Sequence, residues 1–70
     1  MFYARLKLYD PLAGVATGHH RYLIFKDQES LQAWYEGHVH DLALVGVGEC
    51  SFNSRGILQY DEDHEQHLHD

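Results

Sequence analysis

The sequence predicts a small α+β domain in which one helix packs across one face of an antiparallel sheet of about four strands. Three observations lead to this fold class. A chain of 70 residues has room for a single core. Hydrophobic residues make up 44% of it, which is enough to fill that core. Strand-like and helix-like stretches follow each other in the order β-β-α-β-β over residues 1–60, which we expect to form the single domain.

The first two strands are expected at residues 2–9 and 19–26. In the first stretch, alternate side chains divide between an apolar face and a solvated face: Phe2, Ala4, Leu6 and Leu8 on the former, Tyr3, Arg5, Lys7 and Tyr9 on the latter. Asp10-Pro11 ends this strand, because proline has no N–H for the ladder. The second stretch is rich in aromatic and β-branched residues. We therefore expect a hairpin with a long connection.

A helix is expected over residues 28–36, with an extension to residue 40 left open. Asp27 is a good N-cap, because its carboxylate accepts a hydrogen bond from a free N–H of the first turn. Apolar and aromatic side chains recur at the spacing i, i+3, i+4 and i+7, which places them on one face: Leu31, Trp34, Tyr35 and His38. This face is expected to cover the sheet.

The remaining strands are expected at residues 42–47 and 57–60. The first of these is almost continuously apolar, as a buried central strand is. Gly46 and Gly48 indicate a bulge or a close approach of another chain segment. Residues 53–56 form a strong turn signal. Four strands and one helix leave the far sheet face partly open, which favours association of two copies through an edge or that face.

Residues 61–70 are predicted to be a flexible acidic tail. This stretch contains several carboxylates and histidines but one apolar side chain, Leu68. So little apolar surface does not offset the entropy lost when a segment becomes ordered.

Charge is unevenly distributed along the chain. The net charge is −6, yet residues 1–26 carry a net +3, and residues 27–54 carry five carboxylates with no Lys or Arg. An acidic surface is repelled by nucleic acid and attracted to the basic surfaces of other proteins. We therefore predict a partner-binding surface in the middle of the chain, with one aromatic anchor. Its residues are Asp27, Glu29, Glu36, Asp41 and Glu49, with Trp34 or Tyr35 as the anchor.

Two alternatives remain open. The strand face formed by Tyr3, Arg5, Lys7 and Tyr9 interleaves aromatic and cationic side chains, and such a face can stack bases and hold phosphates. His38 and His40 have the spacing of two metal ligands on one strand face. Histidines at a helix end are more often simply exposed. The main hypothesis therefore includes no metal and no other cofactor, and no direct contact with nucleic acid.

The sequence gives little support for catalysis. The single Cys50 lies in a predicted strand, where a thiol is usually buried and unreactive. A nucleophile motif such as G-x-S-x-G is missing, as is the third glycine of a phosphate-binding G-x-G-x-x-G loop. We therefore expect a non-enzymatic protein. The chain also lacks an apolar run long enough to cross a membrane and a signal-peptide pattern, so a cytoplasmic location is expected.

The stretch from Phe25 to Gly37 resembles a segment of a type I-F anti-CRISPR protein. Phe25, Glu29, Leu31, Trp34, the aromatic Tyr35 and Gly37 stand at the same offsets. The short, acidic, cysteine-poor chain also resembles phage-encoded inhibitors of host defence in general. The resemblance implies a protein that binds a host protein or ribonucleoprotein, such as a CRISPR–Cas effector, in the host cytoplasm. It would block nucleic-acid binding or the recruitment of another component.

Overall fold

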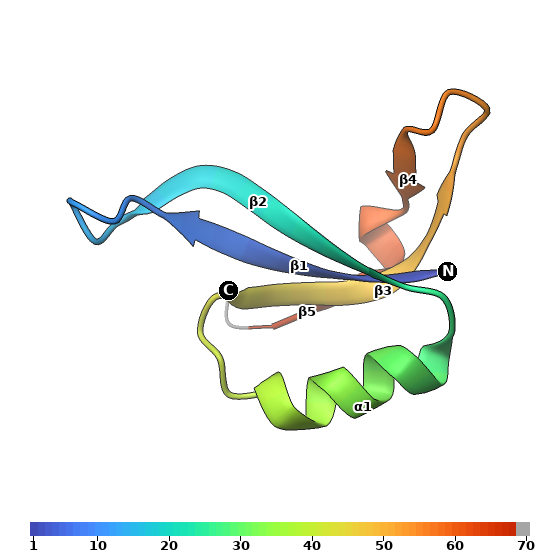
Figure 1. Cartoon of the computed structure of the whole chain (residues 1–70), viewed down its shortest axis with the longest axis horizontal. Helices are drawn as coiled ribbons and strands as arrows, with labels where there is room; N and C mark the ends of the chain where they lie inside the picture. The colour runs from blue at the N-terminus through green and yellow to red at the C-terminus, as the bar shows by residue number, and fades with distance from the viewer. Residues whose placement is uncertain (69–70) are drawn as a thin grey trace.

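The computed structural model describes residues 1–68 of the chain. An antiparallel sheet curls into a half-barrel, and one α-helix packs against one of its faces (Figure 1). The elements are β1 (Phe2–Tyr9), β2 (Ala16–Phe25), α1 (Gln28–His38), β3 (Leu44–Phe52), β4 (Leu58–Tyr60), the 3₁₀ helix η1 (Glu62–His64) and β5 (Gln66–His67). The predicted α+β class and the order β-β-α-β-β are confirmed.

The sheet has the strand order β2-β1-β3-β4, and β5 pairs with β3 beyond the end of β4. The strand β1 lies between its two longest partners. It pairs with β2 from Phe2 opposite Phe25 to Tyr9 opposite Ala16, and with β3 from Phe2 opposite Glu49. The β1–β2 hairpin extends past the end of α1, so its turn stands away from the body of the domain (Figure 1).

The helix α1 begins at the predicted cap and covers the core. The Asp27 carboxylate accepts a hydrogen bond of 2.8 Å from the Ser30 N–H. The buried core cluster consists of Ala4, Leu31, Leu44 and Val47, and half-buried apolar side chains, Trp34 and Tyr35 among them, pack around it. In residues 1–68 no helix is both long and apolar enough to cross a membrane.

Three expectations about the strands are wrong in detail. Leu8, the next-to-last residue of β1, is 42% exposed rather than buried. This end of the β1–β2 hairpin extends past α1 (Figure 1). The third strand begins at Leu44 and continues to Phe52, because Asp41 forms a turn that leaves Leu42 outside the strand and 70% exposed. Tyr3 has no exposed surface, although it lies on the face that we expected to be solvated.

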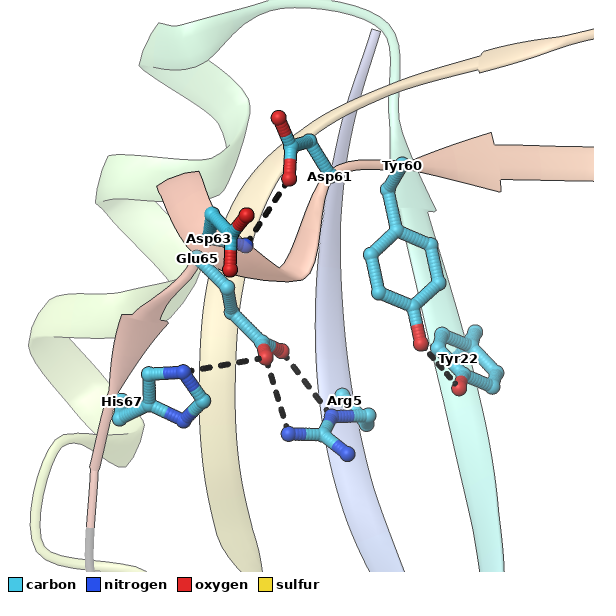
Figure 2. A network of polar contacts seen from close by, with 7 residues as sticks. All are labelled: Arg5, Tyr22, Tyr60, Asp61, Asp63, Glu65 and His67. Atoms are coloured by element: carbon cyan, nitrogen blue, oxygen red, sulfur yellow. Dashed lines mark hydrogen bonds and ion pairs between the residues drawn. The ribbon is translucent and has the colours of Figure 1, made fainter.

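Tyr3 is buried because the sheet curls. Its ring lies 4.5 Å from the ring of Tyr60 and 6.1 Å from the ring of Tyr22, centroid to centroid. The hydroxyls of Tyr22 and Tyr60 are hydrogen-bonded at 2.8 Å, which joins the two outermost strands, β2 and β4 (Figure 2). Gly48 pairs with Tyr3 across β1 and β3, and the lack of a side chain at Gly48 lets the Tyr3 ring lie over β3. These three tyrosines form a second, smaller core inside the curl.

The expected flexible tail is wrong for residues 61–68, which we call the C-terminal segment. The segment forms η1 and β5, and the N–H of Leu68 donates to the Val45 carbonyl at 2.8 Å. Leu68 packs against the core, and Glu65 is buried. The composition argument failed because it counted apolar surface only. Backbone pairing with β3 and one buried ion pair hold the segment. Residues 69 and 70 of the predicted tail lie outside the described residues.

Glu65 makes the contact that holds the C-terminal segment. Its carboxylate accepts hydrogen bonds from Arg5 Nε at 3.0 Å and Arg5 Nη2 at 2.9 Å, and its side chain is 0% exposed (Figure 2). Glu65 immediately precedes β5, and to reach β1 its side chain crosses β3 above Gly46. A Cβ atom on Gly46 would overlap Glu65 Oε1. The sequence indicated a close approach of another chain segment at Gly46, and the segment that approaches there is the side chain of Glu65.

Replacing Glu65 with Ala should destabilise the domain strongly, because it leaves the Arg5 guanidinium, whose side chain is only 16% exposed, without its carboxylate. Removing one partner of a buried pair costs about 3 kcal/mol or more. Urea denaturation followed by circular dichroism measures this. Asp63→Ala is the control, since that exposed neighbour holds no partner through its carboxylate in residues 1–68, and it should change stability by less than about 0.5 kcal/mol. Equal losses would show that the pair does not hold the segment.

Gly46→Ala should destabilise the folded domain only while Glu65 is present. The added methyl meets Oε1, Cδ and Cγ of Glu65, and all three atoms are absent in Glu65→Ala. A double-mutant cycle on the free energy of unfolding should therefore give a coupling of about 1–3 kcal/mol, with the second substitution costing little once the first is made. Additive losses would show that Gly46 is needed for another reason.

Candidate functional site

The carboxylates of the predicted acidic residues form no ion pair with a Lys or Arg of residues 1–68. Within residues 1–68, Arg5 with Glu65 is the only ion pair between a carboxylate and a Lys or Arg. None of the five carboxylates of residues 27–54 has such a partner, and four of the five are exposed, with Asp27 intermediate. Such carboxylates are available to a cation from another molecule.

Asp27 and Asp41 have structural roles in the chain. Asp27 caps α1, and the hydrogen bond from the Ser30 backbone lowers the pKa of its carboxyl. Asp41 accepts a 2.9 Å hydrogen bond from the Ala43 N–H and shapes the turn into β3. Both contacts are local.

Glu29, Glu36 and Glu49 are the carboxylates with the greatest freedom to bind a partner. All three are exposed, and within residues 1–68 only the carboxylate of Glu36 accepts a hydrogen bond, a weak one of 3.4 Å from Gln32 Nε2. Glu29 and Glu36 lie two turns apart on α1. Glu49 lies on β3, opposite Phe2 of β1.

The structure adds two carboxylates that we had placed in a flexible tail. Glu62 and Asp63 lie on η1, where they are exposed. The Asp61 side chain caps η1 by accepting a 2.9 Å hydrogen bond from the Asp63 N–H (Figure 2). That cap is the sequence signal that could have revealed this turn. We call Glu29, Glu36, Glu49, Glu62 and Asp63 the acidic surface.

A groove of about 220 Å³ lies between α1 and β3, and we call it the α1–β3 groove. Its apolar lining comes from β1, α1 and β3: Phe2, Leu31, Tyr35 and Val47. Its polar lining is rich in amides: Gln28, Gln32 and Gln66, together with Glu49 and His64. Two residues of the predicted binding surface, Tyr35 and Glu49, therefore meet at one groove.

Trp34 is engaged within the helix. Its ring stacks flat on His38, with centroids 4.3 Å apart and an angle of 8° between the planes, and it packs at 5.7 Å against Phe25. His38 Nδ1 lies 2.7 Å from the Trp34 carbonyl oxygen. Of the two predicted anchors, Tyr35 is the one that lines the groove.

The described residues contain no group of three or more His, Cys, Asp or Glu side chains placed to hold a metal ion. His38 uses one ring nitrogen on the Trp34 carbonyl, and His40 is exposed two residues further on. The structure therefore does not bring these two histidines together with further ligands in residues 1–68.

A second, more open trough of about 510 Å³ lies beside β4 and η1. It is lined by Glu49, Cys50, Ser51, Gln59, Tyr60, Asp61 and His64. Asp61 Oδ2 lies 2.7 Å from His64 Nδ1, and the hydrogen bonds from the Asp63 N–H and from His64 lower the pKa of Asp61. Burial raises the pKa of Cys50, so this thiol is protonated at neutral pH. The trough offers hydrogen bonds to a ligand but no thiolate.

The basic strand face does not present the residues that base stacking needs. Tyr3 is covered by the other tyrosines, and Arg5 is committed to Glu65. Burial alone would lower the pKa of Arg5, but the hydrogen bonds and charge of Glu65 outweigh it and raise that pKa. Of the four residues of this face, only Lys7 and Tyr9 are left with a side chain that a partner could contact.

The tyrosine hydroxyls lie in a poorly hydrated site. Burial raises the pKa of Tyr60 to about 12, with a further contribution from its hydrogen bond with Tyr22. Burial and the nearby negative charge of Glu65 raise the pKa of Tyr3 well above its ordinary range. Tyr3 Oη is buried without a hydrogen-bond partner among residues 1–68. This cluster is a packing feature whose polar atoms carry an energetic cost.

Comparisons of the chain with protein families, with curated proteins and with solved structures found no match.

Alkaline pH should unfold the domain through the tyrosine cluster. Tyr60 keeps its proton up to about pH 12 in the folded state, whereas an unfolded tyrosine loses it near pH 10.0, so stability should fall as the pH rises between these values. Phenolate absorbance and circular dichroism measure the two events together. Tyr22→Phe removes one cause of the shift and should lower the pKa of Tyr60, whereas Tyr9→Phe, at an exposed site, should not. Ordinary titration of all tyrosines in the folded state would contradict this prediction.

Proposed function

We propose that this protein is a non-enzymatic inhibitor from a phage or mobile element that binds a basic surface of a host protein or ribonucleoprotein. The observation that supports this proposal is the acidic surface: exposed carboxylates from α1, β3 and η1 that have no Lys or Arg partner in residues 1–68. No internal ion pair has to break before these groups meet a partner's cations. The inhibitor acts in the host cytoplasm and uses no cofactor.

Fixed spacing is what allows carboxylates to compete with nucleic acid. Glu29 and Glu36 are separated by two helical turns, which is a rise of about 10 Å along α1. Charges held at such a separation match a groove of Lys and Arg side chains that otherwise binds phosphates. A partner whose groove is filled in this way loses its access to DNA or RNA.

The resemblance to an anti-CRISPR segment falls on the same part of the fold. Residues 25–37 comprise the end of β2 and most of α1, including both Glu29 and Glu36. A type I-F CRISPR effector complex is therefore the first partner to test, by capture on the immobilised protein from a bacterial lysate and then with the purified complex. Recovery of the complex would support the proposal. Recovery of nuclease-sensitive RNA or DNA alone would favour the basic strand face instead.

Neutralising Glu29 and Glu36 together should weaken binding to that complex by about tenfold, or about 0.7 kcal/mol for each charge. Binding should also weaken as salt rises, because the Debye length falls from about 10 Å at 0.1 M to about 3 Å at 1 M. Biolayer interferometry of Glu29→Gln/Glu36→Gln over a salt series measures both effects.

A matched control separates placement from net charge. Ala13→Lys/Ser54→Lys raises the net charge by the same two units, but at the exposed turns of the two hairpins, away from α1. This variant should bind within about twofold of the unmodified protein. If the two double variants lose affinity equally, the acidic face of α1 is not the binding surface.

A further inference from the structure

The α1–β3 groove shares Glu49 with the acidic surface. Its volume of about 220 Å³ falls below the roughly 300–1,000 Å³ of typical small-molecule sites. The apolar lining formed by Phe2, Leu31, Tyr35 and Val47 suits one large apolar side chain rather than a polar metabolite. Tyrosine is also among the residues that most often anchor protein interfaces.

The polar lining suits a peptide backbone next to such a side chain. Gln28, Gln32 and Gln66 each offer an amide that both donates and accepts hydrogen bonds. Neither Gln28 nor Gln66 uses its side-chain amide in a hydrogen bond within residues 1–68. The groove also lies where the outer ladder of β3 is interrupted, since β5 pairs with residues 46–47 and β4 with residues 50–52. Gly48 and Glu49 lie in this gap.

The negative charge in and near the groove favours a partner segment with positive charge. Among residues 1–68, Glu49 and His64 are the titratable groups of its lining besides Tyr35, and no Lys or Arg of this part of the chain lines it. Glu49 is itself a lining residue, Glu29 is the sequence neighbour of the lining residue Gln28, and Glu62 and Asp63 precede the lining residue His64. A segment entering the groove would therefore be favoured by Lys or Arg on each side of its apolar residue.

We propose that the α1–β3 groove is the anchor pocket of the acidic surface, and that it takes one large apolar side chain from a basic extended segment of the partner. This inference rests on the proposed function and specifies what the acidic surface recognises. A second copy of this chain fits less well. Its most exposed apolar side chain, the 97% exposed Leu12, lies in a hairpin turn, and residues 8–18 contain Asp10 but no Lys or Arg.

The experiment uses three blocked heptapeptides and the full-length ¹⁵N-labelled protein. The first peptide has a central leucine flanked on each side by two arginines, the second has serine in place of leucine, and the third has glutamates in place of the arginines. Amide shifts in NMR spectra report the affinity and the site. The leucine–arginine peptide should bind at least tenfold more tightly than either of the others, with the largest shifts at Gln28, Gln32 and Glu49.

Two variants with the same change in charge locate the site. Glu49→Lys places a cation in the groove, whereas Ala13→Lys/Ser54→Lys adds the same two units of charge at exposed turns outside the residues that line it. Glu49→Lys should weaken binding of the leucine–arginine peptide at least tenfold, and Ala13→Lys/Ser54→Lys by less than about threefold. A thermal melt of each variant confirms that it is folded, and Glu49→Gln, which should give an intermediate loss, serves if Glu49→Lys is not.

The outcomes separate this inference from the proposed function. If the leucine and serine peptides bind equally and both interactions weaken with salt, binding of basic segments by the acidic surface is supported. The proposal that the groove is an anchor pocket is then wrong. If the glutamate peptide binds as well as the arginine peptides, both are wrong. No binding by any peptide overturns the anchor pocket. Concentration-dependent self-association that Leu12→Asp abolishes and that protects the groove amides would overturn it in favour of a second copy.

Discussion

The carboxylate of Glu65 reaches Arg5 by passing over Gly46, and this contact links three strands in one step: β5, β3 and β1. It places a charged pair on the face of the sheet that the helix leaves uncovered. The cluster of Tyr3, Tyr22 and Tyr60 lies close to this pair, since the charge of Glu65 contributes to the raised pKa of Tyr3, and Tyr22 and Tyr60 are seen near Arg5 in Figure 2. His67, at 3.8 Å from the same carboxylate, adds a cation there whenever it is protonated.

This contact also determines what the helix side of the molecule presents. With Glu65 fixed, its neighbour Gln66 pairs with Val47 and lines the α1–β3 groove, and η1 is held next to β3. Gln66 and His64, on either side of Glu65, then line the groove together with Gln28 and Gln32 of α1. The contact between Glu65 and Arg5 thus helps to form the wall of the groove opposite α1.

The sequence was sufficient for the elements whose signals are local. Alternation located β1, aromatic and β-branched residues located β2, and a cap followed by helical spacing located α1. Arg5 and Glu65 are 60 residues apart, and no periodicity connects them. Tyr3 was placed on the correct face but judged exposed, because strand alternation says nothing about how far a sheet curls. For the candidate site, the free carboxylates and Tyr35 were predicted, whereas the groove and the η1 carboxylates depend on how the C-terminal segment packs.

The distance along the chain between Arg5 and Glu65 has a consequence for biosynthesis. An isolated hairpin such as β1–β2 is marginally stable in water, and its partners β3 and Glu65 are made later. At roughly 5 to 20 residues per second, a ribosome needs about 2 to 8 seconds to go from the end of β2 to Glu65. Until Glu65 is made, Arg5 lacks its carboxylate and Tyr3 lacks the cover of Tyr60. The domain can therefore complete its packing only when nearly the whole chain has been synthesised.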